Sequence, residues 1–191
     1  MKNVALSVTA SLFLLSSINA ATLKKESIRV SFEGYKTEEM VGVKGEFKNI
    51  QYKLGKDTKS IAGTLKGASA IIAPNSVDME EGNEEITKNI INAFFATLLP
   101  KNGNVQVNFR DVVEGNNKGV ISAQITIGNQ STIIPLTYMV NNNKFEAHGQ
   151  LDLHVFNNAN KALKALSDAA PGHGGISWPL VDIVVTADIQ K

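Results

Sequence analysis

The chain has 191 residues, a formal net charge of +1 and no cysteine. Without cysteine, disulfides, thiolate chemistry and cysteine-ligated metals are excluded. The near-neutral charge lacks the basic excess that nucleic-acid binding requires, so we expect no nucleic-acid partner.

Residues 1–20 have the composition of a secretory signal peptide. Lys2 supplies a positive start, the run from Val4 to Ile18 is mainly apolar, and Ala20 is a small residue that suits cleavage. The apolar run is too short for a comfortable membrane span, so we expect no stable membrane insertion. Because an exported chain without cysteine fits a bacterial periplasm, we predict a periplasmic protein whose residues 21–191 form a single domain.

The mature part of the chain shows apolar and polar residues in alternation, the pattern of half-buried strands. Eight or nine such segments follow one another with short polar turns, and this favours an antiparallel barrel over a parallel sheet. Pro135 predicts an edge or a bulge in its strand. The expected fold is mainly β, an extended antiparallel β-barrel of about eight strands with two helical insertions. The expected strands lie near residues 28–33, 41–47, 50–54, 65–73, 105–110, 121–127, 134–140, 145–153 and 181–185.

The first helical insertion is expected between Glu84 and Pro100. Apolar residues recur there at helical spacing, Asn83 caps the first turn and Pro100 ends the run. Such a helix either lies over the mouth of the barrel and lines an apolar ligand cavity, or completes an ordinary core. A second helix is expected from about Asn157 to Ala169.

The polar residues do not assemble into a recognised catalytic or metal-binding motif. His148, Asp152 and His154 share one face of a strand, but His148 and Asp152 are roughly 13 Å apart along it. No G-x-S-x-G motif and no glycine-rich phosphate loop is present. We therefore predict a protein that is not an enzyme, with no catalytic residue, no metal and no cofactor. A lipid hydrolase or isomerase stays open if His148 or His173 points into the cavity beside Asp152 or a serine.

The chain instead carries a surplus of large apolar residues on the expected strands and helix. In one interpretation they line a tunnel for an acyl or isoprenoid chain, where each buried methylene contributes about 0.8 kcal/mol. In the other they pack solidly, and the protein is a structural or interaction module. The candidate lipid-binding residues are Phe47, Ile90, Ile91, Phe94, Phe95, Leu98, Phe109, Tyr138, Phe145 and Trp178.

The order of several segments resembles the YceI-like family of exported lipid-binding proteins. These segments are Ser27–Phe47, Leu65–Asn83, Thr126–Val140, Ala147–Phe156 and Ile176–Val185. The resemblance implies a lipocalin-like barrel, a periplasmic location, a homodimer, and a long amphiphilic lipid such as a polyisoprenoid or fatty amide as ligand. It supplies no catalytic residue.

The chain departs from the pattern of that family at two places where a headgroup is expected. Glu84 and Glu85 stand where many members have an Arg-Asp pair, and Pro171–Trp178 replaces a basic stretch. We therefore expect the apolar channel, more than an anionic headgroup preference, to define the ligand. The resulting expectation is a non-enzymatic periplasmic protein that carries or stores a long-chain amphiphile.

Overall fold

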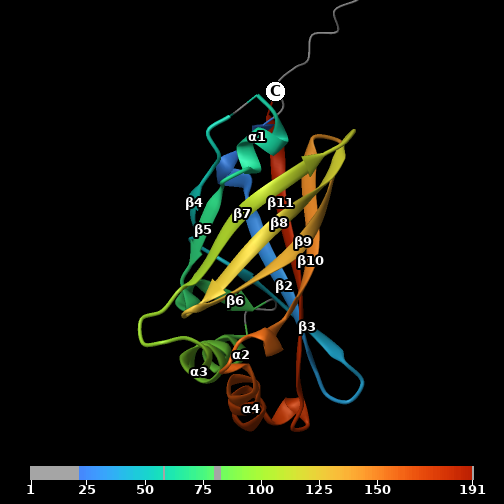
Figure 1. Ribbon diagram of the computed structural model, residues 1–191. Coiled ribbons are helices and arrows are strands. Elements are labelled where there is room, and N and C mark those ends of the chain that lie inside the picture. Colours follow the sequence, from blue (N-terminus) through green and yellow to red (C-terminus); the bar gives the residue numbers. More distant parts are fainter. Residues whose placement is uncertain (1–21, 58, 80–82, 191) are drawn as a thin grey trace, which may run out of the picture.

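The computed structural model describes residues 22–57, 59–79 and 83–190. The expected signal peptide, residues 1–20, lies outside the described residues. In the described part the chain is mainly β, and its strands form one curled antiparallel sheet (Figure 1). The expected fold class is confirmed.

The sheet has eleven strands, more than the eight or nine expected. Each of the nine expected segments contains a strand, and two short strands, β1 and β6, were not expected. The strands are β1 (Thr22–Leu23), β2 (Arg29–Lys36), β3 (Val41–Phe47), β4 (Gln51–Lys53), β5 (Ser69–Ile72), β6 (Val77–Met79), β7 (Val105–Glu114), β8 (Lys118–Ile127), β9 (Gln130–Asn141), β10 (Lys144–Asp152) and β11 (Ser177–Gln190).

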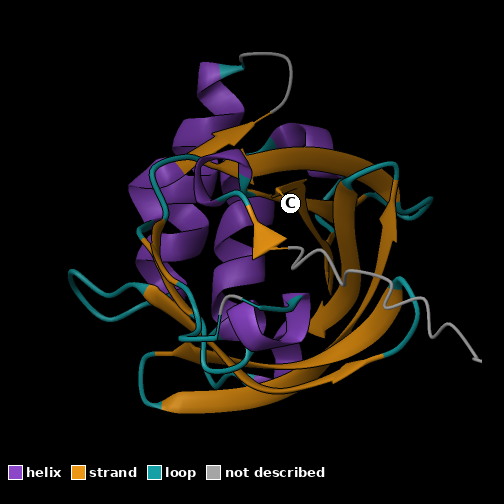
Figure 2. Cartoon of the chain, turned by 90° about the horizontal axis from the view of Figure 1, so that it is seen from above, coloured by secondary structure: helices purple, strands orange, loops and turns teal. Residues whose placement is uncertain are grey.

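The strand order is β4-β5-β7-β8-β9-β10-β11-β2-β3-β6, with β1 added alongside β11. Neighbours along this path are antiparallel, and most are also neighbours in the sequence. The two ends of the path, β4 and β6, are not paired with each other, so hydrogen bonds do not close the barrel. Viewed from above in Figure 2, the strands form a curved wall.

Pro135 lies in β9 where one side of the strand is free. The ladder between β9 and β8 includes Pro135, opposite Ser122. The ladder between β9 and β10, in contrast, ends at the pair Thr137–His148. Pro135 is therefore paired with β8 and lies beyond the end of the β9–β10 ladder, a place in a sheet that tolerates a residue without an N–H.

The helices gather at the two ends of the curved sheet. Figure 1 shows α1 at one end, and α2, α3 and α4 together at the other. Among the described residues, none of the helices has the length and apolarity that crossing a bilayer requires. The helices are α1 (Ile61–Leu65), α2 (Glu84–Asn89), the π-helix η4 (Ile90–Phe95), α3 (Ala96–Leu98) and α4 (Ala159–Ala169), with short 3₁₀ turns η1 (Lys25–Ser27), η2 (Pro74–Ser76), η5 (Leu153–Val155) and η6 (Pro171–His173).

Both expected helical insertions are present, and α1 is an addition. The Ser60 hydroxyl accepts a 2.9 Å hydrogen bond from the Gly63 N–H and caps α1. The chain then turns at Gly67, whose φ of 74° suits glycine, before β5 begins at Ser69. The expected strand over residues 65–73 is therefore wrong before Ser69, where β5 begins. The helix α1 was not predicted, because five residues are too few to show helical periodicity in the sequence.

The most tightly packed part of the interior lies against β8, β9 and β10. Ile121 and Ala147 are fully buried, and Tyr138 and Phe145 are each 1% exposed. The rings of Tyr138 and Phe145 pack with their centroids 5.2 Å apart. Other residues of the same three strands, such as Ile125, Ile134 and Leu151, line the cavity described next.

Candidate binding cavity

The space between the curved sheet and the helices is a cavity of about 390 Å³. This volume falls in the range of small-molecule sites in proteins. The wall is overwhelmingly apolar, and strands, helices and loops from most of the described chain contribute to it. The barrel interior is therefore not solidly filled by its own side chains.

The cavity is elongated along the sheet. Ser177 and Ala187 both line it and lie near opposite ends of β11. At the rise of an extended strand, ten residues cover roughly 30 Å. A hollow of this shape suits a chain-like molecule better than a compact one.

The strands β7 and β8 contribute to the wall through side chains at every second position, as the pleat requires. In β7 these residues are Val105, Val107 and Phe109, and in β8 they include Ile125 and Ile127. On β2 and β11 most of the wall residues are half-buried, whereas Ala187 of β11 is buried. The half-buried residues on these two strands include Val30, Phe32, Val181, Ile183 and Val185.

The helical segment from Glu84 to Leu98 covers one end of the cavity, as one of the two interpretations of the sequence predicted. Ile86, Ile90, Phe94, Phe95 and Leu98 all line the hollow. The Phe94 and Phe95 rings meet edge to face with centroids 5.2 Å apart. The segment is helical throughout, but its middle part, η4, is a π-helix, which the sequence did not predict.

The residues expected to bind lipid lie on the cavity wall with two exceptions, Ile91 and Tyr138. Ile91 is half-buried against the core, because the wider i→i+5 turn of η4 changes which residues share a face. Tyr138 is enclosed by Phe145 and by Gly119 on the neighbouring strand. The expected residues on the wall are Phe47, Ile90, Phe94, Phe95, Leu98, Phe109, Phe145 and Trp178.

Sequence reasoning missed one complete face of the wall, the inner side of β2. Val30 and Phe32 begin the inward series, and Gly34 and Lys36 continue it at the same spacing. A Cβ atom added at Gly34 would meet no heavy atom within 4 Å, so the cavity is open beside this residue. The alternation of Val30 and Phe32 was visible in the sequence, but the expected strand ended at residue 33, before Gly34 and Lys36.

A chain of hydrogen bonds lies at the helical end of the cavity. His173 Nδ1 is 2.7 Å from Ser177 Oγ, and Ser177 Oγ is 2.8 Å from Ser167 Oγ. The Ser167 hydroxyl also donates to the Leu163 carbonyl at 3.1 Å. Burial, together with the positive charge of Lys36, lowers the pKa of His173. The imidazole is therefore neutral near pH 7.

The contact between His173 and Ser177 is the serine–histidine pair on which the hydrolase alternative depended. A general base in such a pair must take up a proton and is normally oriented by a third group, often a carboxylate. Within the described ranges no carboxylate pairs with His173, and the neighbouring Lys36 opposes protonation. The pair is better suited to hydrogen bonding a ligand than to activating a nucleophile.

The other two histidines lie on the outer surface. His148 is exposed on β10, with Nε2 2.5 Å from a Glu146 carboxylate oxygen, and His154 pairs with Asp152 at 3.4 Å. Asp152 also accepts a 2.9 Å hydrogen bond from the His154 N–H. In the part of the chain that the structure describes, no group of three or more potential ligands is placed to hold a metal ion.

Solved structures share this architecture. BcnA from Burkholderia cenocepacia matches over 88% of this chain and 99% of its own, with 16% identity and a TM-score of 0.56. The YceI protein of Campylobacter jejuni matches over 82% of this chain and 90% of its own, with 18% identity and a TM-score of 0.53. This chain has a YceI-like fold.

A mutant of the same Campylobacter jejuni protein, crystallised with a monobromobimane guest, aligns with 20% identity, the same coverage and a TM-score of 0.56. No family model matches the sequence, and no curated protein matches it. At identities of 20% or below, the likeness establishes the YceI-like fold alone. The assignment drawn from the ordered sequence motifs and the assignment drawn from the coordinates therefore agree on the architecture.

Proposed function

We propose that this protein is a non-enzymatic member of the YceI-like family that carries or stores a long-chain amphiphilic lipid, of the isoprenoid or fatty-amide type, in its cavity. The observation that carries the proposal is the elongated apolar hollow, walled by strands along its length and by η4 at one end. Burial of a long hydrocarbon tail there contributes about 0.8 kcal/mol for each methylene. A tail alone is then sufficient for tight binding.

The proposal includes the location of the protein and its organisation. Residues 1–20 act as a cleaved signal peptide, residues 21–191 form the lipid-binding domain, and the protein works in the periplasm, where a homodimer is expected. The support for this part is the sequence pattern of the first 20 residues and the ordered motifs of the mature chain.

Gly34 offers a direct test, because the space beside it is open. A Gly34→Leu substitution places a side chain in the cavity, and the Cβ atom of that side chain meets no heavy atom within 4 Å. The matched control is Glu33→Leu, one position earlier on the same strand and outside the cavity wall. Lipid in the purified protein is measured by organic extraction and mass spectrometry, and folding by thermal unfolding.

We expect stoichiometric lipid in the parent protein and in Glu33→Leu, and occupancy lowered by at least about tenfold in Gly34→Leu without loss of stability. Phe95→Asp, which places a charge on the η4 wall, should also lower occupancy more than it lowers yield. A parent protein that binds no lipid, or a Gly34→Leu variant with unchanged occupancy, would contradict the proposal.

A further inference from the structure

The charged side chains of the cavity wall, together with its histidine, gather at the end that the helices cover. They are Lys36, Glu85 and His173. The opposite end is lined by Leu23, Leu65 and Ala187. Building on the proposed carrier function, we propose that the ligand lies with its tail toward α1 and its head beside Lys36, and that this head carries one negative charge, as in a long-chain carboxylate, in place of the uncharged head of a fatty amide.

The position of Lys36 supports the first part of this inference. The residue ends β2 directly opposite Ser177 of β11 and lines the cavity. Its Nζ atom lies 3.9 Å from the point that a Cβ atom of Gly172 would occupy. Its charge contributes to the lowered pKa of His173, which places the two side chains at the same end of the hollow.

Lys36 has no internal counter-ion among the described residues. No described carboxylate oxygen lies within 4.0 Å of its ammonium group, although eight other ion pairs meet that limit. The Asp182 carboxylate on β11, opposite Glu33, accepts hydrogen bonds from Tyr35 and from Gln150, the latter at 2.9 Å. The ammonium group on the wall is therefore available to an anion from outside the protein.

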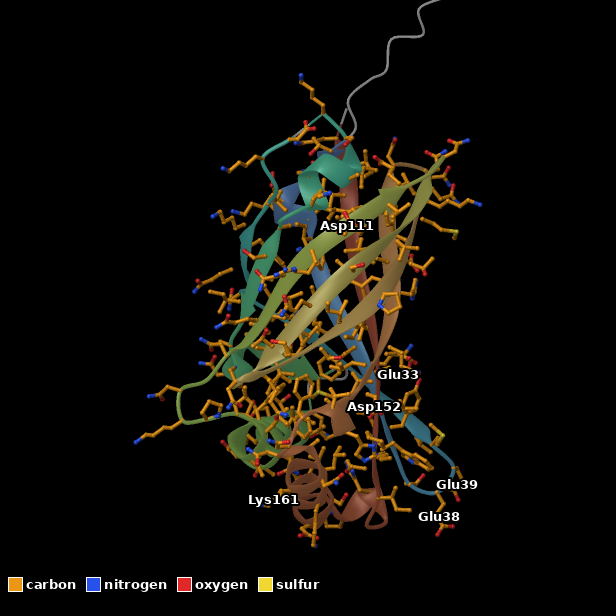
Figure 3. The ribbon with its side chains drawn as sticks, viewed as in Figure 1. Glu33, Glu38, Glu39, Asp111, Asp152 and Lys161 are labelled. Atoms are coloured by element: carbon orange, nitrogen blue, oxygen red, sulfur yellow. The ribbon has the colours of Figure 1, made fainter. Side chains whose placement is uncertain are left out.

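The other charged groups at this end lie away from the wall. Figure 3 shows Glu38 and Glu39 at the tip of the β2–β3 hairpin and Lys161 on α4. All three side chains are exposed, and none lines the cavity. Lys36 is thus the one lysine or arginine on the lining formed by the described residues.

Glu85 limits the charge that the head can carry. It is the only carboxylate on the described lining and stands in the first turn of α2. The Glu85 carboxylate repels an anionic head in proportion to the charge of that head, so it opposes a phosphate with nearly two negative charges more than a head with one. Ser177 and His173 add neutral hydrogen-bonding partners beside Lys36. We therefore favour a carboxylate over a phosphate or a neutral head.

The test compares three probes that share one saturated tail: palmitate, cetyl alcohol and cetyl phosphate. Each is titrated calorimetrically into the delipidated full domain and into Lys36→Gln, Lys36→Arg and Lys161→Gln. Lys161→Gln is the matched control, because it removes an exposed lysine at the same end of the molecule that is not on the wall. Thermal unfolding verifies that each variant is folded.

We expect the parent to bind palmitate more tightly than either other probe. Lys36→Gln should weaken the affinity for palmitate about tenfold, or about 1.4 kcal/mol, because a hydrogen bond to a charged group is lost. The same variant should change the affinity for cetyl alcohol less than about twofold. Lys36→Arg should bind palmitate with an affinity close to that of the parent. Lys161→Gln should leave the affinity for palmitate unchanged. Two results would overturn the inference but leave the carrier function intact. One is an equal loss of affinity for palmitate and for cetyl alcohol in Lys36→Gln, and the other is tighter binding of cetyl phosphate than of palmitate by the parent. If no probe binds the parent, this inference fails, and the carrier function is then decided by whether organic extraction recovers a lipid from the purified protein.

Discussion

The indole Nε1 of Trp178 donates a 2.7 Å hydrogen bond to the backbone carbonyl of Thr37. The bond joins the start of β11 to the turn that follows β2, although 141 residues separate the two positions in the sequence. Thr37 has a φ of 61°, so its backbone is in the left-handed region. Because Trp178 also lines the cavity, one side chain both anchors the β2–β3 hairpin and contributes to the wall.

Trp178→Phe should lower the free energy of unfolding by about 1 kcal/mol, because the ring is kept but the hydrogen bond to Thr37 is lost. Trp178→Ala should lower it further, since ring packing is lost as well. Urea unfolding followed by circular dichroism measures both. A Trp178→Phe variant as stable as the parent would show that this hydrogen bond contributes nothing to stability.

All three tyrosines of the chain should resist ionisation. The pKa of Tyr35 is raised to about 12, chiefly by its hydrogen bond to the Asp182 carboxylate. Burial raises the pKa of Tyr52 and of Tyr138 to about 12. Ultraviolet titration of the native protein should therefore detect no tyrosinate near pH 10, where the unfolded chain titrates.

The same shifts set the alkaline limit of stability. A tyrosine whose pKa is higher in the folded state contributes stability that is complete below pH 10 and is lost as the pH rises toward 12. Asp182→Asn should return the pKa of Tyr35 toward its ordinary value and leave the other two transitions in place. Three transitions near pH 10 in the folded parent would refute this assignment.

Gly119 should not tolerate a side chain. A Cβ atom there would lie 2.3 Å from the Val113 carbonyl oxygen and 2.5 Å from a ring carbon of Tyr138, its partner across the β8–β9 ladder. Gly119→Ala should therefore destabilise the protein by about 1–3 kcal/mol through overpacking. The control is Gly115→Ala, whose nearest contact would be an ordinary 3.4 Å. If thermal unfolding showed that the two variants lose the same amount of stability, overpacking at Gly119 would not be the cause.

The helical segment from Glu84 to Leu98 shows which features of this protein could be predicted from the sequence. Its limits, its Asn83 cap and its apolar face could be predicted, because capping and periodicity are local properties. The π-helical middle part could not, because a change from i→i+4 to i→i+5 bonding leaves no compositional trace. For this reason Ile91 was predicted to line the cavity and does not. Its neighbours Ile90, Phe94 and Phe95 were predicted to line the cavity and do so.

The antiparallel sheet and the two helical insertions could be predicted from local patterns, because alternation, turns and caps depend on residues close together in the chain. Three other features become visible only in the folded protein: the apolar residues surround a hollow, Tyr138 packs inside the sheet, and Lys36 lies at the same end of the hollow as His173. Whether facing side chains meet or leave a space depends on how strongly the sheet curls and where distant segments pack. Local patterns do not fix those distances.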